Sequence, residues 1–199
     1  MRKAIDVAIL FRRNGCTQIN EINLDVADRE IEVSLSEDEH VRIQYSENNK
    51  EYYDISVSGN VLTMKSASNK EWTDYIGFKS DDEYRKISLQ IPNTLLENLT
   101  LSTTNEDITL SDLAVTGSIN ISSAEGDITF GTLAVGNALT LSAKNGDISG
   151  AVAGSYDDFA IRSEIKKGES NLPDNKDSGE KRLNVSCNNG DIDIELINE

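Results

Sequence analysis

The chain has 199 residues, a net charge of −16, two cysteines and only two prolines. Strand-forming and turn-forming residue types dominate, which favours an all-β protein over a helical one. So acidic a body repels phosphate groups, which argues against binding of DNA, RNA or anionic membranes. Cationic partners suit it better, although high negative charge also serves solubility.

Residues 1–18 carry a net charge of +3, from four basic residues and one acidic residue. Their apolar run contains Asp6 and is followed by Arg12 and Arg13, which does not match a secretory signal peptide. No apolar run is long enough to span a membrane, so the sequence alone predicts a cytoplasmic location. We expect residues 1–18 to be an N-terminal segment that includes a short helix capping the β domain.

Residues 19–98 show the alternation of apolar and polar positions that is typical of half-buried strands. Ser58-Gly59-Asn60 separates two such runs and predicts a tight hairpin. Pro92 should end the strand that precedes it. Residues 69–83 are polar with embedded aromatic residues and predict a long loop. The alternating positions include Ile22, Leu24, Val26, Ile31, Val33, Leu35, Val41, Ile43, Tyr45, Ile87, Leu89 and Ile91.

One short phrase recurs four times in the second half of the chain. The first three copies are 20 residues apart, and a fixed period of this length is typical of a stacked β architecture. The glycines of the phrase are expected at positive φ, which a Cβ would penalise. The copies are Asn105-Glu106-Asp107-Ile108, Glu125-Gly126-Asp127-Ile128, Asn145-Gly146-Asp147-Ile148 and Asn189-Gly190-Asp191-Ile192.

Two β architectures fit this repeat. In a β-solenoid, each unit is one coil of about three short strands, and equivalent residues stack about 4.8 Å apart. In the alternative, each Asn-Gly is a two-residue hairpin turn, which pairs Cys187 with Ile192. We favour the solenoid because Leu113-Ala114-Val115 recurs in step as Leu133-Ala134-Val135.

The solenoid interpretation predicts one domain over residues 19–199, with regular repeats over residues 99–199 and less regular strands before them. It also predicts two internal ladders of apolar side chains. One would run through Leu99, Ile119, Leu139, Phe159 and Leu183, and the other through Ile108, Ile128, Ile148 and Ile192.

The repeated aspartates Asp107, Asp127, Asp147 and Asp191 would stack on one edge of such a fold. Like charges about 4.8 Å apart repel by roughly 0.9 kcal/mol per neighbour in a water-like dielectric, and a bound Ca²⁺ would relieve this. The alternative, which we favour, is that each carboxylate accepts backbone N–H groups at its corner. The four aspartates are therefore weak metal candidates, and we predict no catalytic residue and no cofactor.

Other chemistry-bearing residues are few. Paired carboxylates can cleave polysaccharides, but no basic or aromatic residue recurs beside the aspartates. His40, the only histidine, lies in an acidic turn and belongs to no nucleophile motif. Cys16 and Cys187 lack metal-ligand spacing, and we expect two buried free thiols, with a disulfide as the alternative. Trp72, Tyr75 and Phe78, with Tyr52, Tyr53 and Tyr84 nearby, form either a binding patch or a cover for an open end.

These features together resemble the bacterial family called putative adhesins, a domain of unknown function found in many Gram-positive genomes. The resemblance covers the chain from about residue 19. It implies a β-solenoid-like fold, an association with the cell envelope, and neither catalytic residues nor a cofactor. The residues that carry it are Ile22–Val26, Ile87–Pro92, the Asn-Gly-Asp-Ile repeats and the closing run Leu183–Ile192.

We therefore expect a non-enzymatic binding or structural module. Its partner would be a protein, a glycan or a cationic molecule, without nucleic-acid binding or membrane insertion. Uncapped strand edges would also invite self-association. A Ca²⁺-dependent module with a carboxylate edge is the first alternative, and a polysaccharide-acting β-helix enzyme is a less favoured one.

Overall fold

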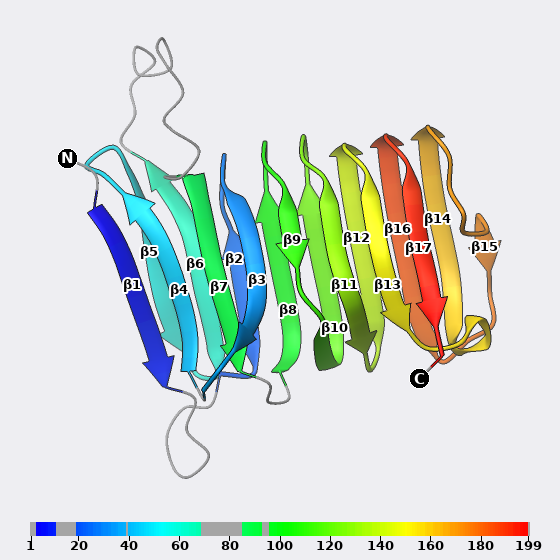
Figure 1. Cartoon of the computed structure of the whole chain (residues 1–199), viewed down its shortest axis with the longest axis horizontal. Coiled ribbons are helices and arrows are strands. Elements are labelled where there is room, and N and C mark those ends of the chain that lie inside the picture. The colour runs from blue at the N-terminus through cyan, green and yellow to red at the C-terminus, as the bar shows by residue number, and fades with distance from the viewer. Residues whose placement is uncertain (1–2, 11–18, 39, 69–84, 93–95, 199) are drawn as a thin grey trace.

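The computed structural model describes residues 3–10, 19–38, 40–68, 85–92 and 96–198. In these ranges 17 strands join in one mixed sheet, so the all-β prediction is confirmed. Within them, no helix is both long and apolar enough to cross a membrane. The sheet is folded over into two layers (Figure 1), and the buried apolar side chains form one core.

The first layer is the front one in Figure 1. Its four N-terminal strands include antiparallel pairs, and its later strands pair in parallel. In spatial order the strands are β1 (Lys3–Leu10), β4 (His40–Glu47), β7 (Lys86–Pro92), β3 (Glu30–Ser36), β9 (Ile108–Leu110), β11 (Ile128–Val135), β13 (Ile148–Ala153) and β17 (Ile192–Ile197).

The second layer lies behind the first. It begins and ends with antiparallel pairs and is parallel between them. In spatial order its strands are β5 (Glu51–Ser58), β6 (Val61–Ser68), β2 (Glu21–Asp25), β8 (Leu96–Thr103), β10 (Leu113–Ser123), β12 (Ala138–Asn145), β16 (Lys181–Asn189), β14 (Phe159–Lys167) and β15 (Asn175–Lys176).

Successive 20-residue repeats stack in parallel and in register. Ile119 pairs with Leu139 in the second layer, and Ile128 pairs with Ile148 in the first. Each unit therefore supplies two strands rather than the three predicted. The segment predicted as a third strand does stack in register, with Leu113-Ala114-Val115 paired in parallel with Leu133-Ala134-Val135. It is not a separate element, because it opens β10 in one unit and ends β11 in the next.

The ladder through Ile108, Ile128, Ile148 and Ile192 is confirmed, and Ile31 extends it toward the N-terminal half. All of these side chains are at most 2% exposed. Fully burying such a side chain contributes roughly 1.5–3 kcal/mol, so the ladder is a main source of stability.

The other predicted ladder is wrong at Phe159, because the units do not stack in chain order. β16 lies between β12 and β14, so Leu183 pairs with Leu139 on one side and with Ile161 on the other. Phe159 instead pairs with Lys181, and its side chain is buried in the same core, outside the ladder. The hairpin alternative is also wrong, since β16 and β17 pair with earlier strands in parallel and not with each other.

The N-terminal half follows its alternating pattern except at Leu35, which is 40% exposed near the end of β3. Gly59 and Asn60 connect the antiparallel strands β5 and β6, as predicted, and β7 ends at Pro92. Part of the N-terminal segment differs from the prediction, because β1 is a strand and not a helix. Ile5 and Val7 alternate along it and pack against the core, which a strand paired with β4 allows. Residues 1–2 and 11–18 lie outside the described ranges.

Cys187 is a free thiol that is only 1% exposed, so the disulfide alternative is wrong. It lies on β16 opposite Ala143, and its Sγ donates to the Gly146 carbonyl at 3.4 Å. Burial raises the pKa of this thiol, and the nearby charges of Asp147 and Asp191 raise it further. Cys16 lies outside the described residues.

We predict that Cys187 resists alkylation while the protein is folded. In a Cys16→Ser variant, iodoacetamide at pH 8 should modify it at least about tenfold more slowly than it modifies the denatured chain, because burial withholds the thiolate. Mass spectrometry over time measures both rates. Equal rates would mean that β16 does not stay inserted between β12 and β14.

Candidate functional site: the aspartate row

The four repeated aspartates lie at the same corner of neighbouring units, where the chain passes from the second layer to the first. We call Asp107, Asp127, Asp147, Asp191 and Glu169, which follows them in space, the aspartate row. The backbone N–H of every row residue after Asp107 donates to Oδ1 of the aspartate that precedes it in space. The distance is 2.8 Å in all four of these hydrogen bonds. Side chains therefore join successive units here.

The backbone of the next residue completes the pattern. The N–H of Ile108 donates to the carbonyl of Asp127 at 2.9 Å, and that of Ile128 donates to the carbonyl of Asp147 at 2.8 Å. A backbone N–H needs an acceptor wherever the ladder is interrupted by a turn. The aspartate supplies that acceptor for the residue just before the isoleucine.

This arrangement agrees with our expectation that the carboxylates accept backbone N–H groups, although the donor belongs to the next unit. One oxygen of each of the four aspartates is thereby occupied. Among the residues that the structure describes, no group of three or more His, Cys, Asp and Glu side chains is arranged to hold a metal ion.

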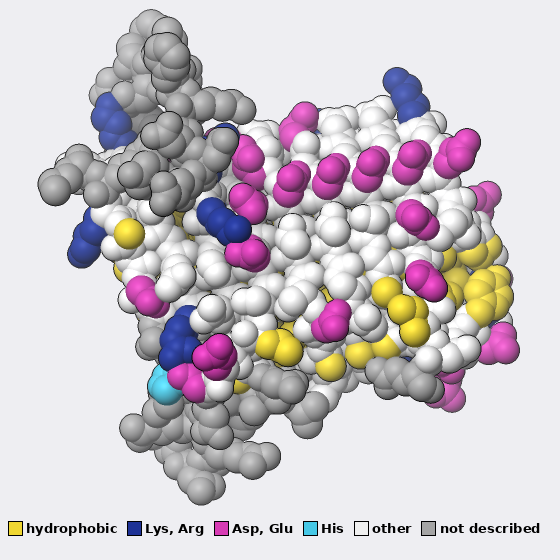
Figure 2. Space-filling view, viewed as in Figure 1, with side chains coloured by type: hydrophobic (Ala, Val, Ile, Leu, Met, Phe, Trp, Pro, Cys, Tyr) yellow, Lys and Arg dark blue, Asp and Glu magenta, His cyan; other side chains and the backbone are white. Residues whose placement is uncertain are grey.

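The aspartate row is nevertheless open to solvent. Its five acidic side chains are exposed, and Figure 2 shows acidic side chains in a line along one edge of the molecule. Water and salt screen the repulsion between them, and the N–H group facing each aspartate offsets part of its charge. The row is thus both a structural seam and a line of regularly spaced negative charge.

A second row runs beside the first, and sequence reasoning missed it. Asn145 donates from Nδ2 to Glu125 at 2.8 Å, Asn189 donates to Asn145, and Asn105 donates to Asp28. Ladders of this kind stabilise stacked strands. The recurrence of Asn at the first position of the phrase was the available signal.

Glycine is required in the recurring phrase for two different reasons. Gly146 and Gly190 have φ of 145° and 143°, as predicted. Gly126 is not at positive φ, and the prediction is wrong there. A Cβ at Gly126 would lie 2.2 Å from the carbonyl carbon and oxygen of Glu106, so close backbone approach requires glycine. Glu106 itself pairs with the buried Arg85.

Asp112 is a further carboxylate that joins two units. Its Oδ1 accepts the N–H of Thr132 at 2.7 Å, at the place where the register shifts. The same solution therefore serves a second interruption of the ladder. Asp112 has no counterpart in the recurring phrase, which is why periodicity did not reveal it.

His40 begins β4, and its Nδ1 lies 3.2 Å from Asp38 Oδ1. The bond from Arg42, above all, holds the pKa of the Asp38 carboxyl well below its usual range. Asp38 also accepts the backbone N–H of His40 at 3.0 Å. These contacts tie together the turn before β4, and His40 is the first residue of that strand rather than a residue of the predicted turn.

The aromatic cluster is only partly described. Trp72, Tyr75, Phe78 and Tyr84 lie outside the described residues. Tyr53 belongs to the core, where its ring meets that of Tyr45 edge-on at 5.0 Å between centroids. Its hydroxyl accepts from Arg29 Nε at 2.6 Å, and burial raises the pKa of Tyr53.

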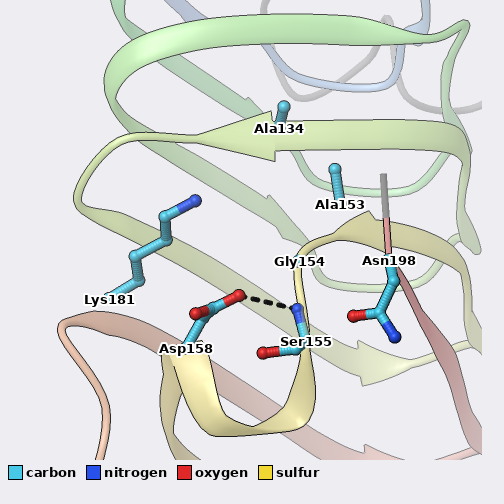
Figure 3. A pocket seen from close by; sticks show the side chains of 7 residues that line it. All are labelled: Ala134, Ala153, Gly154, Ser155, Asp158, Lys181 and Asn198. Atoms are coloured by element: carbon cyan, nitrogen blue, oxygen red, sulfur yellow. Dashed lines mark hydrogen bonds between the residues drawn. The ribbon is translucent and has the colours of Figure 1, made fainter.

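A small cavity of about 300 Å³ is lined by residues of β11, β13 and the C-terminal units, which Figure 3 shows. Ser155, Asp158, Lys181 and Asn198 supply its polar groups. Asp158 belongs to the short 3₁₀ turn η3 (Tyr156–Asp158) and accepts the Ser155 N–H at 2.7 Å, and its bonds with Ser155 lower the pKa of this carboxyl. Lys181 and Asn198 are far from Ser155 and Asp158 in the sequence, so no motif indicated the cavity.

Comparison with known proteins places the fold. Residues 19–194 match the profile of the family described as Toastrack DUF4097. The chain belongs to this family. This confirms the predicted resemblance to a putative-adhesin domain of unknown function, and the solved structure of a putative cell adhesion protein shares the fold. No curated protein matches the chain.

Two solved structures illustrate the likeness. One is that of a putative cell adhesion protein from Clostridium sporogenes, which is 15% identical with a TM-score of 0.65, over 98% of this chain and 100% of that one. It shows a shared fold. The other is that of a putative adhesin from Parabacteroides merdae, 17% identical with a TM-score of 0.42, over 96% and 81% of the two chains. This similarity is too weak to add to the fold assignment.

We predict that Asp127 acts through its acceptor oxygen more than through its charge. Asp127→Ala leaves the Asp147 N–H without that acceptor and should lower the free energy of unfolding by about 1–2 kcal/mol. Asp127→Asn retains an acceptor oxygen and should change it by less than about 0.5 kcal/mol. Urea denaturation of both variants checks this, and equal losses would contradict it.

We also predict that two glycines at positive φ differ in their tolerance of alanine. A Cβ at Gly59 meets nothing within 4 Å, whereas one at Gly146 would lie 2.4 Å from the Gly126 carbonyl oxygen. Gly59→Ala should lower the free energy of unfolding by about 1–2 kcal/mol, because alanine disfavours the backbone conformation of this residue. Gly146→Ala should cost at least about 2 kcal/mol more, because the neighbouring strand must move. Thermal unfolding of the pair measures the difference.

Proposed function

We propose that the protein is a non-enzymatic binding or structural module of the adhesin type that works at the cell envelope. The observation that carries this proposal is the use made of its repeated carboxylates. Each of the four aspartates holds the next unit through a backbone N–H, which is a scaffolding role. The structural likeness to a putative cell adhesion protein agrees with it.

We further infer that the stacked units form a β-solenoid. The support is the parallel pairing of residues 20 positions apart in both layers, with one strand of each unit in each layer. A stack of this kind presents identical surface positions at strand spacing, about 4.8 Å apart. Such a surface suits a ligand that itself repeats.

The ligand that best fits the aspartate row is a linear cationic chain. The row is exposed, its charges have one sign, and the whole protein carries −16. Arrays of charge attract oppositely charged partners and raise their association rates. A cationic segment of an envelope protein or an amine-bearing glycan has this chemistry.

Thermal melting at low salt tests the proposal. Decalysine at 100 times its Kd should raise Tm by about 5–10 °C, since binding then contributes about 2.7 kcal/mol. The double variant Asp127→Asn, Asp147→Asn removes two charges and keeps two acceptor oxygens, so its shift should be clearly smaller. A control with the same net charge is Asp157→Asn, Glu195→Gln, two exposed sites outside the row.

Further arms of the experiment use Ca²⁺, EDTA and a neutral cell-wall glycan. A rise of Tm with Ca²⁺ that EDTA reverses would replace the proposal with a cation-dependent module. Saturable cleavage of the glycan that the double variant abolishes would replace it with an enzyme. Equal decalysine shifts in the double variant and its control would remove the aspartate row from the binding surface.

A further inference from the structure

The two ends of the stack are finished differently. At the C-terminal end of the second layer, the segment after β14 folds back along the outer edge of β14. There β15 pairs with β14, and the Ser163 N–H donates to the Asp174 carbonyl at 3.1 Å. Lys176 fixes this cover by donating to the Phe159 carbonyl at 2.8 Å. The remaining edge of β14 carries charged side chains, which discourage pairing with another strand.

The N-terminal end of the first layer has a different edge strand. All eight residues of β1 pair with β4 on one side, and within the described residues no strand pairs with its other side. A strand in this position directs alternate N–H and C=O groups outward. Its only charged residues are Lys3 and Asp6, so the strand is neutral overall.

We propose that two copies of this chain associate through the free edge of β1, by an antiparallel β1–β1 pair that extends the first layer across both copies. This inference goes beyond the proposed binding role and does not depend on it. Addition of a strand to an exposed edge is a general mode of association, in which backbone hydrogen bonds supply affinity. A two-fold axis makes the interface self-complementary.

The sequence of β1 limits the register of such a pair. An axis through Asp6 would set two carboxylates directly opposite each other, which is unfavourable. An axis through Ile5 sets Ile5 opposite Ile5 and Ala4 opposite Asp6, and we assign this register. Ile5 packs against the core of its own copy, so the pair would join the two cores along one edge.

Charge also favours this place of contact. Two copies that each carry −16 repel one another, and the repulsion is smallest where the surface is neutral. β4, β7 and β3 separate β1 from β9, which begins just after Asp107, so the aspartate row starts well away from the interface. Added salt should therefore strengthen the association.

Sedimentation equilibrium of the full chain tests the proposal, at 0.05 and 0.5 M NaCl. We expect exchange between 21.9 kDa and twice that mass, with a lower Kd at high salt. Ala4→Asp, which would oppose Asp6 twice, should raise the dimer Kd at least about tenfold, and Ala4→Lys should lower it. Ala114→Asp adds the same charge at an exposed site on β10 and should have little effect.

Hydrogen exchange provides a second readout at the same positions. Amides of residues 3–7, which face one another in this register, should become more protected as protein concentration rises, and Ala4→Asp should abolish that dependence. A strict monomer at millimolar concentration in 0.5 M NaCl would overturn the proposal. So would a dimer whose Kd responds equally to Ala4→Asp and Ala114→Asp, or one that leaves exchange in residues 3–7 unchanged. Circular dichroism confirms that each variant is folded.

Discussion

The architecture depends on one requirement, that a peptide N–H at each corner must find an acceptor after the chain leaves one strand ladder and before it enters the next. The carboxylate of the preceding unit meets it at 2.8 Å, in four consecutive steps. Because Asp is followed directly by Ile, the same corner turns an apolar side chain into the core. Two adjacent residues thus fix both the hydrogen bonding of the turn and the register of the ladder.

Much of the fold could be predicted because its signals are local. Alternating apolar residues, the turn at Gly59 and the recurring isoleucine each depend on neighbours in the sequence. The order of the last two units could not be predicted in this way. Leu183 and Ile161 are both apolar ladder residues, and periodicity does not record which unit lies next to which. β1 was missed because eight residues with a mixed pattern fit a short helix as well as a strand.

The candidate site was predicted in part for the same reason. Repetition revealed the aspartates, but it could not say that their donors belong to the next unit in space. Asp112 and the cavity near Asp158 were missed because each occurs once and draws on residues from separate units. Contacts that recur leave a trace in the sequence, and contacts made once do not.

The insertion of β16 between β12 and β14 has a consequence for how the molecule is made. Units from Leu96 to Ala153 can be added one on another as the chain leaves the ribosome, because each pairs with strands that precede it in the chain. Residues 159–172 cannot take their final place at that stage, because their partner strand is synthesised after them. Assembly of the last two units is therefore a joint step, and a defect in either should delay both.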